Sequence, residues 1–368
     1  MTWEKMLRPH LAALEPYQPI VPVEVLAQES GNTVDGVIKL DGNENPYGPS
    51  LRVARAMADY PFFHIYPDPD QRQLRQALEG YVGLGAEHIV AGAGSDELID
   101  LLLRLFLEPR DQVINLTPTF GMYPFSTHIC GGEVVEVPRD DDFQIDLAAV
   151  RRKLRPRVKI VFVASPNNPS GNLATQEQVL GLLDMGLLVV VDEAYYEFAG
   201  ETVVHLVKEH PNLVVLRTFS KWAGLAGLRV GYAVCHPGLV KHIMRIKPPY
   251  NLNVAAQVAA VESLKDLECL QARVLDIVAE RERLYRLLQG LDSLHPYTSR
   301  ANFILCSLQG WDAREAYMRL RQQGIFLRYF SNPRVSHCLR ISVGKPEQSD
   351  ATLTALSHAE KEMAVRPK

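Results

Sequence analysis

The middle of the chain alternates short apolar segments with longer helical ones, and this alternation constrains the fold most. Five segments rich in Val, Ile and Leu have the length of buried strands: His88–Ala91, Gln112–Leu116, Lys159–Ala164, Leu187–Asp192 and Leu213–Thr218. Segments of helical character follow the first three of them: Asp96–Leu107, Tyr123–Cys130 and Thr175–Leu183. Continuous apolar strands separated by helices are typical of a mainly parallel sheet covered on both faces. The pattern therefore predicts an α/β core.

A change of pattern after Pro248 and Pro249 predicts a second, smaller lobe. Residues 254 to about 288 read as one or two charged amphipathic helices, which suit a bridge out of the core. Three strands and two helices are expected beyond this bridge: Ala301–Leu308, Trp311–Gln323, Ile325–Tyr329, Cys338–Val343 and Gln348–Met363. We expect a large domain over residues 41–250, bridging helices and a small α+β domain over 251–368, and an N-terminal arm over 1–40 that packs with the small domain.

Length, charge and cysteine content exclude several classes of protein. The chain has 368 residues, enough for two lobes, and a formal net charge of −4, which favours a small-molecule ligand over nucleic acid. No apolar stretch is long enough to cross a bilayer, so we expect a cytoplasmic location. The cysteines are odd in number, and neither they nor the histidines show metal-binding spacing. We expect no metal site and five free thiols: Cys130, Cys235, Cys269, Cys306 and Cys338.

The most informative motif lies around Lys221. This lysine follows an apolar strand and the hydroxyl residue Ser220, and Arg229 comes eight residues later between two glycines. A lysine amine can bind a cofactor aldehyde covalently when burial and nearby cations lower its pKa. A serine hydroxyl and the donor fork of an arginine can hold the phosphate of the same cofactor. A surface lysine beside a salt-bridged arginine is the alternative for an isolated pair, so the motif depends on its neighbours.

Two other strand ends supply groups that such a cofactor needs. Asp192 ends an apolar strand, where a buried carboxylate is costly unless it meets a cation such as a protonated pyridine nitrogen. Tyr195 and Asn168, the latter in a proline-rich turn, could hydrogen-bond the phenolic oxygen of the ring. Asp192 could instead cap the next helix, and Asn168 could serve only its turn. Ligands of open parallel sheets bind at the carboxyl ends of strands, where Asn168, Asp192 and Lys221 are all expected.

Two further segments fit a phosphorylated ring. The residues Gly94, Ser95 and Asp96 lead into a helix, and free backbone N–H groups at a helix start can bind phosphate. Phe120 follows another strand and could stack on a planar heterocycle, or it could be an ordinary core aromatic. Together with Lys221, these segments indicate a pyridoxal 5′-phosphate (PLP) site.

The combined motifs resemble the fold-type I PLP-dependent aminotransferases, and within them the histidinol-phosphate aminotransferase family. The resemblance extends over nearly the whole chain. It rests on the segments Leu14-Glu15-Pro16-Tyr17-Gln18-Pro19, Asp41-Gly42-Asn43-Glu44-Asn45-Pro46, Tyr66-Pro67-Asp68-Pro69 and Leu339-Arg340-Ile341-Ser342-Val343-Gly344. It implies a large domain with a mainly parallel sheet between helices, a smaller α+β domain and a role in histidine biosynthesis.

The resemblance also implies a role for each site residue. Lys221 would anchor PLP covalently and act as the general base, and Asp192 would pair with the pyridine nitrogen. The remaining cofactor contacts would come from Gly94, Ser95, Asp96, Phe120, Asn168, Tyr195, Ser220, Arg229 and Tyr66. Tyr66 would reach over from the other subunit of a homodimer. The substrates, histidinol phosphate and glutamate or 2-oxoglutarate, would be bound by Tyr17, Asn43, Arg328 and Arg340.

Three positions depart from the family pattern. Phe120 stands where tyrosine is more frequent, Trp222 where a small residue usually follows the lysine, and Tyr329 where an acidic residue is common. An aromatic amino-acid aminotransferase or a threonine-phosphate decarboxylase would share every cofactor contact, because a fold does not define a substrate. A PLP-binding regulatory protein would need an added nucleic-acid-binding module, and the forty residues before Asp41 are too few and too little basic for one.

Overall fold

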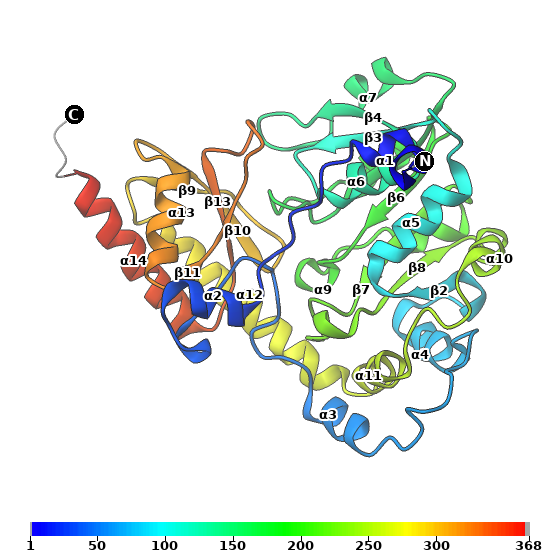
Figure 1. The fold of residues 1–368 in the computed structure, drawn as a ribbon, viewed down its shortest axis with the longest axis horizontal. Helices are drawn as coiled ribbons and strands as arrows, with labels where there is room; N and C mark the ends of the chain where they lie inside the picture. The colour runs from blue at the N-terminus through cyan, green and yellow to red at the C-terminus, as the bar shows by residue number, and fades with distance from the viewer. Residues whose placement is uncertain (1, 365–368) are drawn as a thin grey trace.

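The computed structural model describes residues 2–364 and folds them into two lobes (Figure 1). Met1 and residues 365–368 lie outside the described residues. They belong to the ranges expected for the N-terminal arm, 1–40, and for the small domain, 251–368. The large lobe contains the strands β2 (Ile89–Gly92), β3 (Gln112–Thr117), β4 (Glu133–Pro138), β5 (Val158–Ala164), β6 (Leu188–Asp192), β7 (Leu213–Thr218) and β8 (Gly231–Cys235). Its helices are α3 (Leu51–Ala58), α4 (Arg72–Val82), α5 (Gly94–Phe106), α6 (Met122–Ile129), α7 (Leu147–Lys153), α8 (Gln176–Leu183), α9 (Tyr196–Ala199), α10 (Pro237–Ile246) and α11 (Val254–Leu264).

The sheet of the large lobe has the strand order β2-β8-β7-β6-β5-β3-β4. Strand β8 runs antiparallel to its two neighbours, and the pairs from β7 to β4 are all parallel. The prediction of a mainly parallel sheet in an α/β fold is therefore confirmed. The sequence pattern missed β4, an edge strand that exposes Glu133 and Glu136, and β8, a five-residue strand that begins at a glycine. Strand β4 meets solvent on one side, and β8 is buried but starts at a glycine, which weakens the strand signal.

Side chains on the two faces of the sheet pack into two separate cores. Val161 and Val163 of β5 face a core built with α3, α4, α8 and α11, and Ile160 and Phe162 face a core built with α5, α6 and α10. Successive residues of a strand point to opposite faces, so a strand covered by helices on both sides must be apolar throughout. This double burial fixes the carboxyl ends of β5, β6 and β7 in a rigid frame.

The small lobe is built on the chain that follows α11. Helix α12 (Leu267–Leu288) runs from the large lobe to the small one, as Figure 1 shows. The other elements are β9 (Leu294–Pro296), β10 (Phe303–Leu308), α13 (Ala313–Gln322), β11 (Ile325–Phe326), β12 (Arg328–Tyr329), β13 (Cys338–Ser342) and α14 (Pro346–Ala364). An antiparallel sheet of order β12-β13-β10-β9 packs against the helices. The single strand expected at residues 325–329 is two strands, since β11 pairs instead with β1 (Ile38–Lys39).

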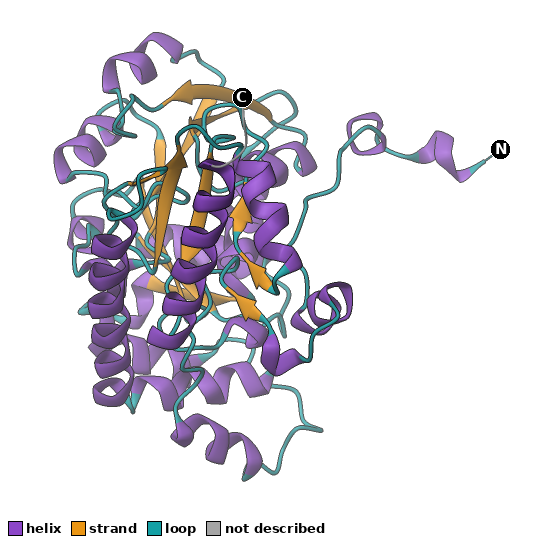
Figure 2. Cartoon of the chain, turned by 90° about the vertical axis from the view of Figure 1, so that its left-hand side faces the viewer, coloured by secondary structure: helices purple, strands orange, loops and turns teal. Residues whose placement is uncertain are grey.

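The N-terminal arm divides between the lobes, which corrects the expectation that it packs with the small domain. Helix α2 (Val23–Ser30) does so, because Leu26 and Ala27 bury themselves against Phe326. Helix α1 (Pro9–Ala12) instead lies against α6 of the large lobe. The first residues project from the body of the molecule (Figure 2). The arm between these helices therefore crosses from one lobe to the other.

Candidate functional site

The carboxyl ends of β5, β6 and β7 bring Asn168, Asp192 and Lys221 to one edge of the central sheet. Asp192 is the last residue of β6, and Lys221 follows the end of β7 by three residues. Parallel strands β5, β6 and β7 are direct neighbours, so their ends lie next to one another. This is the edge at which ligands of open α/β sheets bind. The rest of the candidate site is arranged around it.

Lys221 has the environment expected of a reactive amine. Its Nζ donates a hydrogen bond to the carbonyl oxygen of Gly42 at 2.9 Å. Burial, together with the positive charge of Arg340, lowers the pKa of the Lys221 amine to about 8. A larger share of this amine is therefore neutral near physiological pH than in an exposed lysine. A neutral amine is the nucleophilic and basic form.

Asp192 is buried and hydrogen-bonded at both carboxyl oxygens. The Tyr123 hydroxyl donates to Oδ2 at 2.7 Å, and the backbone N–H of Ala194 donates to Oδ1 at 3.1 Å. Burial raises the pKa of this carboxyl to about 6, although both hydrogen bonds favour the ionised form. A cationic partner would offset the cost of keeping the carboxylate ionised. A protonated ring nitrogen is such a partner.

Tyr123 was not identified as a site residue from the sequence. It stacks on Phe162 of β5 with ring centroids 4.6 Å apart and meets Phe120 edge-on at 5.5 Å. Phe120 and Tyr123 are three residues apart, and such residues share one side of a helical turn. A tyrosine three residues after Phe120 was the only signal in the sequence for this contact. The contact with the Asp192 carboxylate itself depends on the position of β6 in the folded chain.

An anion cradle forms where α5 begins. The Arg229 guanidinium lies over Gly94, donates to Asp96 Oδ2 at 2.9 Å and reaches Ser220 Oγ at 3.3 Å. A Cβ on Gly94 would stand 2.4 Å from Arg229 Nη2, so only glycine permits this approach. The free N–H groups at the start of α5, the guanidinium and the Ser220 hydroxyl together supply donors for a phosphate.

Arg328 and Arg340 face each other across adjacent strands of the small lobe. They are direct register partners on β12 and β13. Arg340 Nη1 donates to Asn168 Oδ1 at 2.6 Å, Nη2 donates to the carbonyl oxygen of Asp41, and Nε is buried without a partner in residues 2–364. Burial lowers the pKa of Arg340 to about 10. A buried guanidinium with an unused donor is suited to an anionic ligand.

The two remaining substrate residues predicted from the sequence lie beside these arginines. Tyr17 packs on Phe125, and the carbonyl of Gln18 accepts a hydrogen bond from Arg328 at 3.4 Å. Burial raises the pKa of Tyr17 against the opposing effect of Arg328. Asn43 Nδ2 donates to the Tyr195 hydroxyl at 2.9 Å. The arm therefore contacts Arg328, and the loop at Asn43 contacts Tyr195.

Tyr66 is the site residue that the single chain does not bring to Lys221. It is 78% exposed, and its one recorded ring contact in the described chain is with Tyr250, at 4.5 Å. The departures Trp222 and Tyr329 also have structural explanations. The Trp222 indole is buried in the core, where it stacks on Tyr81, and Tyr329 stacks on Tyr317 of α13. Neither contact places these side chains in the anion cradle.

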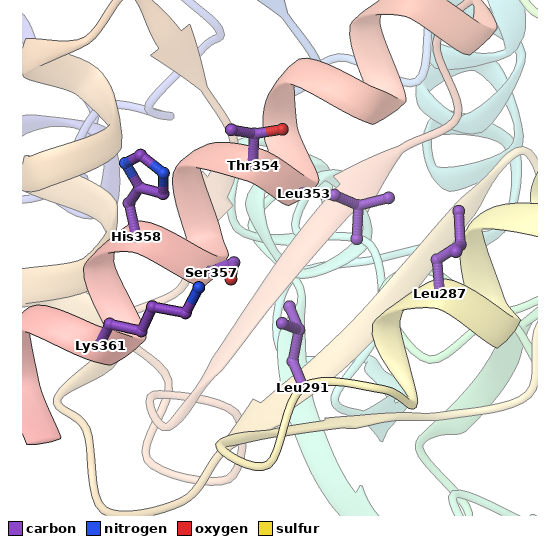
Figure 3. A pocket seen from close by; sticks show the side chains of 7 residues that line it. All are labelled: Leu287, Leu291, Leu353, Thr354, Ser357, His358 and Lys361. Carbon is purple, nitrogen blue, oxygen red and sulfur yellow. The ribbon is translucent and has the colours of Figure 1, made fainter.

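One surface pocket is lined by none of these residues. It measures about 330 Å³ and is lined by residues of α12, α14 and the turn between α12 and β9, none of them predicted as site residues (Figure 3). Its lining combines Leu287, Leu291 and Leu353 with Thr354, Ser357, His358 and Lys361. Among residues 2–364, no group of three or more His, Cys, Asp or Glu could hold a metal ion, and no helix could span a membrane.

Comparisons with known proteins identify the family of this chain. The model of the family described as aminotransferase class I and II matches residues 35–356. This chain belongs to that family. A histidinol-phosphate aminotransferase of Roseiflexus castenholzii is 52% identical over 360 residues, which cover 95% of this chain and 97% of the relative. The chloroplastic histidinol-phosphate aminotransferase of Nicotiana tabacum is 45% identical over 361 residues, covering 97% and 87%.

The solved structures of the aminotransferase family show the same fold. The histidinol-phosphate aminotransferase of Sinorhizobium meliloti, solved in complex with pyridoxal 5′-phosphate, superposes with a TM-score of 0.87 at 29% identity. The match covers 97% of this chain and 98% of that one. The expected fold-type I aminotransferase architecture and membership of the histidinol-phosphate aminotransferases are therefore confirmed.

Proposed function

We propose that this aminotransferase uses PLP to transfer the amino group of L-histidinol phosphate to 2-oxoglutarate, which gives imidazole-acetol phosphate and L-glutamate. One observation carries the proposal. The positive charge of Arg340 helps to lower the pKa of the partly buried Lys221, and the Arg340 guanidinium keeps an unused donor and faces Arg328. Relatives named histidinol-phosphate aminotransferase, which are 42 to 52% identical to this chain, support the choice of substrate.

The residues around Lys221 suit PLP in charge and in shape. Asp192 would hold the pyridine nitrogen, Asn168 and Tyr195 the phenolic oxygen, and Phe120 the face of the ring. The cradle of Gly94, Ser95, Asp96, Ser220 and Arg229 would hold the phosphate, and a Cβ on Gly94 would fill the space that Arg229 occupies. When bound, PLP supplies an electron sink that stabilises negative charge at the substrate carbon.

Lys221 would then move the proton. Its Nζ is held 2.9 Å from the Gly42 carbonyl, which gives a free amine a fixed acceptor and a fixed direction. A pKa of about 8 lets the amine accept a proton and release it again near neutral pH. Lys221 is thus both the covalent anchor and the general base.

Arg328 and Arg340 would bind the anionic end of both substrates. A phosphate on histidinol phosphate and a carboxylate on glutamate both match the donor fork of guanidinium. The cross-strand register holds the two guanidinium groups on neighbouring strands, so one pocket could serve both halves of the reaction. Tyr17 and Gln18 of the arm lie against Arg328 and would exclude water from this pocket.

We further propose a homodimer in which Tyr66 completes the site of the partner subunit. The segment that carries Tyr66 exposes Phe62 at 51%, Phe63 at 53% and Ile65 at 53%. Four large apolar or aromatic side chains within five residues are unusual on a monomer surface and favour an interface. Burial of this segment against a second copy would move Tyr66 from an exposed position into the phosphate cradle of that copy.

A substrate panel tests the proposed reaction. Purified protein with added PLP is assayed with histidinol phosphate, phenylalanine, tyrosine and threonine phosphate, each with 2-oxoglutarate. We expect the highest catalytic efficiency with histidinol phosphate, and removal of either Arg328 or Arg340 should cost roughly 2 kcal/mol of substrate binding, as for a charge-assisted hydrogen bond in a closed site. A preference for phenylalanine, or release of carbon dioxide from threonine phosphate, would reject this choice of reaction.

A further inference from the structure

Asn43 is held by the small lobe at both of its backbone polar groups. Its N–H donates to Ser342 Oγ at 2.9 Å, and its carbonyl accepts from Asn302 Nδ2 at 2.9 Å. The residue is 1% exposed and has a φ of 53°, a left-handed conformation that asparagine tolerates better than most residues. Its position is therefore set by β13 and by the residue that precedes β10.

The side chain of Asn43 belongs to a hydrogen-bond chain with a definite direction. Ser342 Oγ already accepts the backbone N–H of Asn43, so its own hydrogen is free for Asn43 Oδ1, which lies 2.8 Å away. With Oδ1 turned toward Ser342, the amide NH₂ faces Tyr195 and donates to its hydroxyl oxygen at 2.9 Å. The Tyr195 oxygen thus receives a hydrogen from one side and keeps its own to donate.

The described surroundings of Tyr195 leave that hydrogen available for a ligand. Within residues 2–364, the only recorded hydrogen bond of the Tyr195 hydroxyl is the one that it accepts from Asn43. The charged and titratable groups around it are Arg340, Asp192 and Tyr17, and burial raises its pKa, so the hydroxyl stays protonated. The aromatic ring is held edge-on against Phe303 of β10.

We propose that Asn43 is a positioning residue that directs the Tyr195 hydroxyl hydrogen into the crevice, toward the phenolic oxygen of bound PLP. The inference rests on the proposed cofactor, and it changes the role expected for Asn43 from the sequence. The backbone N–H, the carbonyl, Oδ1 and one N–H of the Asn43 amide are engaged with protein groups, and that N–H bonds Tyr195, so we assign Asn43 a role through Tyr195.

This arrangement links the tyrosine to the substrate-binding strand. Ser342, which orients the Asn43 amide, lies two residues after Arg340 on β13, and residues two apart share one face of a strand. Arg340 also bonds Asn168, the second residue proposed to hold the phenolic oxygen. Both ring-oxygen residues are therefore tied to the strand that carries Arg340.

The test compares Asn43→Asp, Tyr195→Phe and the double variant in the PLP-loaded protein. The readout is the pH midpoint of the visible absorption band, which needs no substrate. A hydrogen bond donated to the phenolic oxygen of PLP withdraws negative charge from that oxygen. The nitrogen that would join Lys221 to PLP then holds its proton less tightly, so the pH midpoint is lower when the hydrogen bond is present. An aspartate at position 43 would take the Tyr195 hydrogen for itself. We expect both Asn43→Asp and Tyr195→Phe to raise the midpoint by about one pH unit or more.

The double variant separates an effect on the orientation of the Tyr195 hydroxyl from an effect of the new carboxylate charge. If Asn43 acts through Tyr195, adding Asn43→Asp to Tyr195→Phe should move the midpoint much less than in the wild-type background. An equal shift in both backgrounds would mean that the new carboxylate acts by its charge alone, and an unchanged midpoint in Asn43→Asp would also overturn the inference. Ser342→Ala, which frees the amide to rotate, should give a smaller upward shift and serves as the test if Asn43→Asp does not fold.

A negative result for Asn43 can be distinguished from a negative result for the proposed reaction. The visible band reports only on PLP, so the inference stands or falls on the midpoints even if histidinol phosphate proves to be the wrong substrate. A protein that shows no visible band after incubation with PLP would overturn the proposed cofactor, and the role of Asn43 with it.

Discussion

Lys221 shows how a single residue acquires reactivity from its surroundings. The lowered pKa of its amine comes mainly from burial and from the positive charge of Arg340, which is 119 positions away in the chain, with a smaller effect of Arg229. Asp192 is shifted in the opposite direction by the same cause, since burial disfavours whichever form is charged. The pKa values of Lys221 and Asp192 are therefore set mainly by the fold.

We predict that Lys221→Ala retains PLP but loses turnover. The cradle at Gly94, Ser220 and Arg229 is untouched by the change, so noncovalent PLP binding should persist in equilibrium dialysis. Turnover should fall by about 10²–10⁴-fold or more, the usual contribution of a positioned general base, with loss of the covalent bond added. Borohydride should fix PLP to the wild-type protein at Lys221. Near-normal turnover of the alanine variant would mean that another lysine is the base.

At the scale of elements, the start of α5 and the turn that carries Arg229 form one unit. Gly94 has a φ of 79°, and Arg229 has a φ of 54°, so both backbones adopt left-handed conformations where the two segments meet. Gly231, at the start of β8, is also required, because a Cβ there would stand 2.6 Å from the backbone nitrogen of Ser95. The close approach of these segments is what places a guanidinium over a helix N-terminus.

We predict that Gly94→Ala weakens PLP binding by tenfold or more. The new methyl group would displace Arg229, and the loss of one charge-assisted hydrogen bond to phosphate costs about 1.5–3 kcal/mol. Gly186→Ala is the matched control, since Gly186 has a φ of 76° and nothing within 4 Å of its Cβ position. Both variants should lose similar stability from backbone strain in thermal unfolding. Equal PLP affinity in the two variants would refute a role of Arg229 in phosphate binding.

At the scale of the whole molecule, the proposed dimer predicts that two defective subunits complement each other. Lys221→Ala and Tyr66→Ala proteins should each be impaired alone. If Tyr66 serves the site of its partner, a mixed dimer contains one site with both defects and one intact site. Random mixing of equal amounts should then restore about one quarter of the wild-type sites. Recovery is measured after unfolding and joint refolding, with each variant refolded alone as control.

Two results would contradict this assembly. A mixture no more active than the separate variants would place Tyr66 in its own subunit's site or outside any site. A fully active monomer in sedimentation velocity would remove the dimer itself, and the exposed apolar segment around Tyr66 would then need another partner.

The amino-acid sequence by itself determined the α/β core and named most residues of the candidate cofactor site. Strands buried on both faces must be apolar throughout, which made β2, β3, β5, β6 and β7 recognisable, and motifs at their ends named Lys221, Asp192 and Asn168. The edge strand β4 lacked that signal because one side of it meets solvent. The separate pairing of β11 and β12 was also hidden, because strand pairing depends on distant segments.

Only the tertiary structure decided which groups orient these residues. Tyr123 reaches Asp192 across 69 positions of the chain, and Ser342 reaches Asn43 across 299. Such contacts leave no local pattern, because a hydrogen bond depends on where the chain returns in space. The lowered pKa of Lys221 and the direction of the Tyr195 hydroxyl have the same origin. The sequence supplies the reactive groups, and burial and distant neighbours determine their protonation states and their orientations.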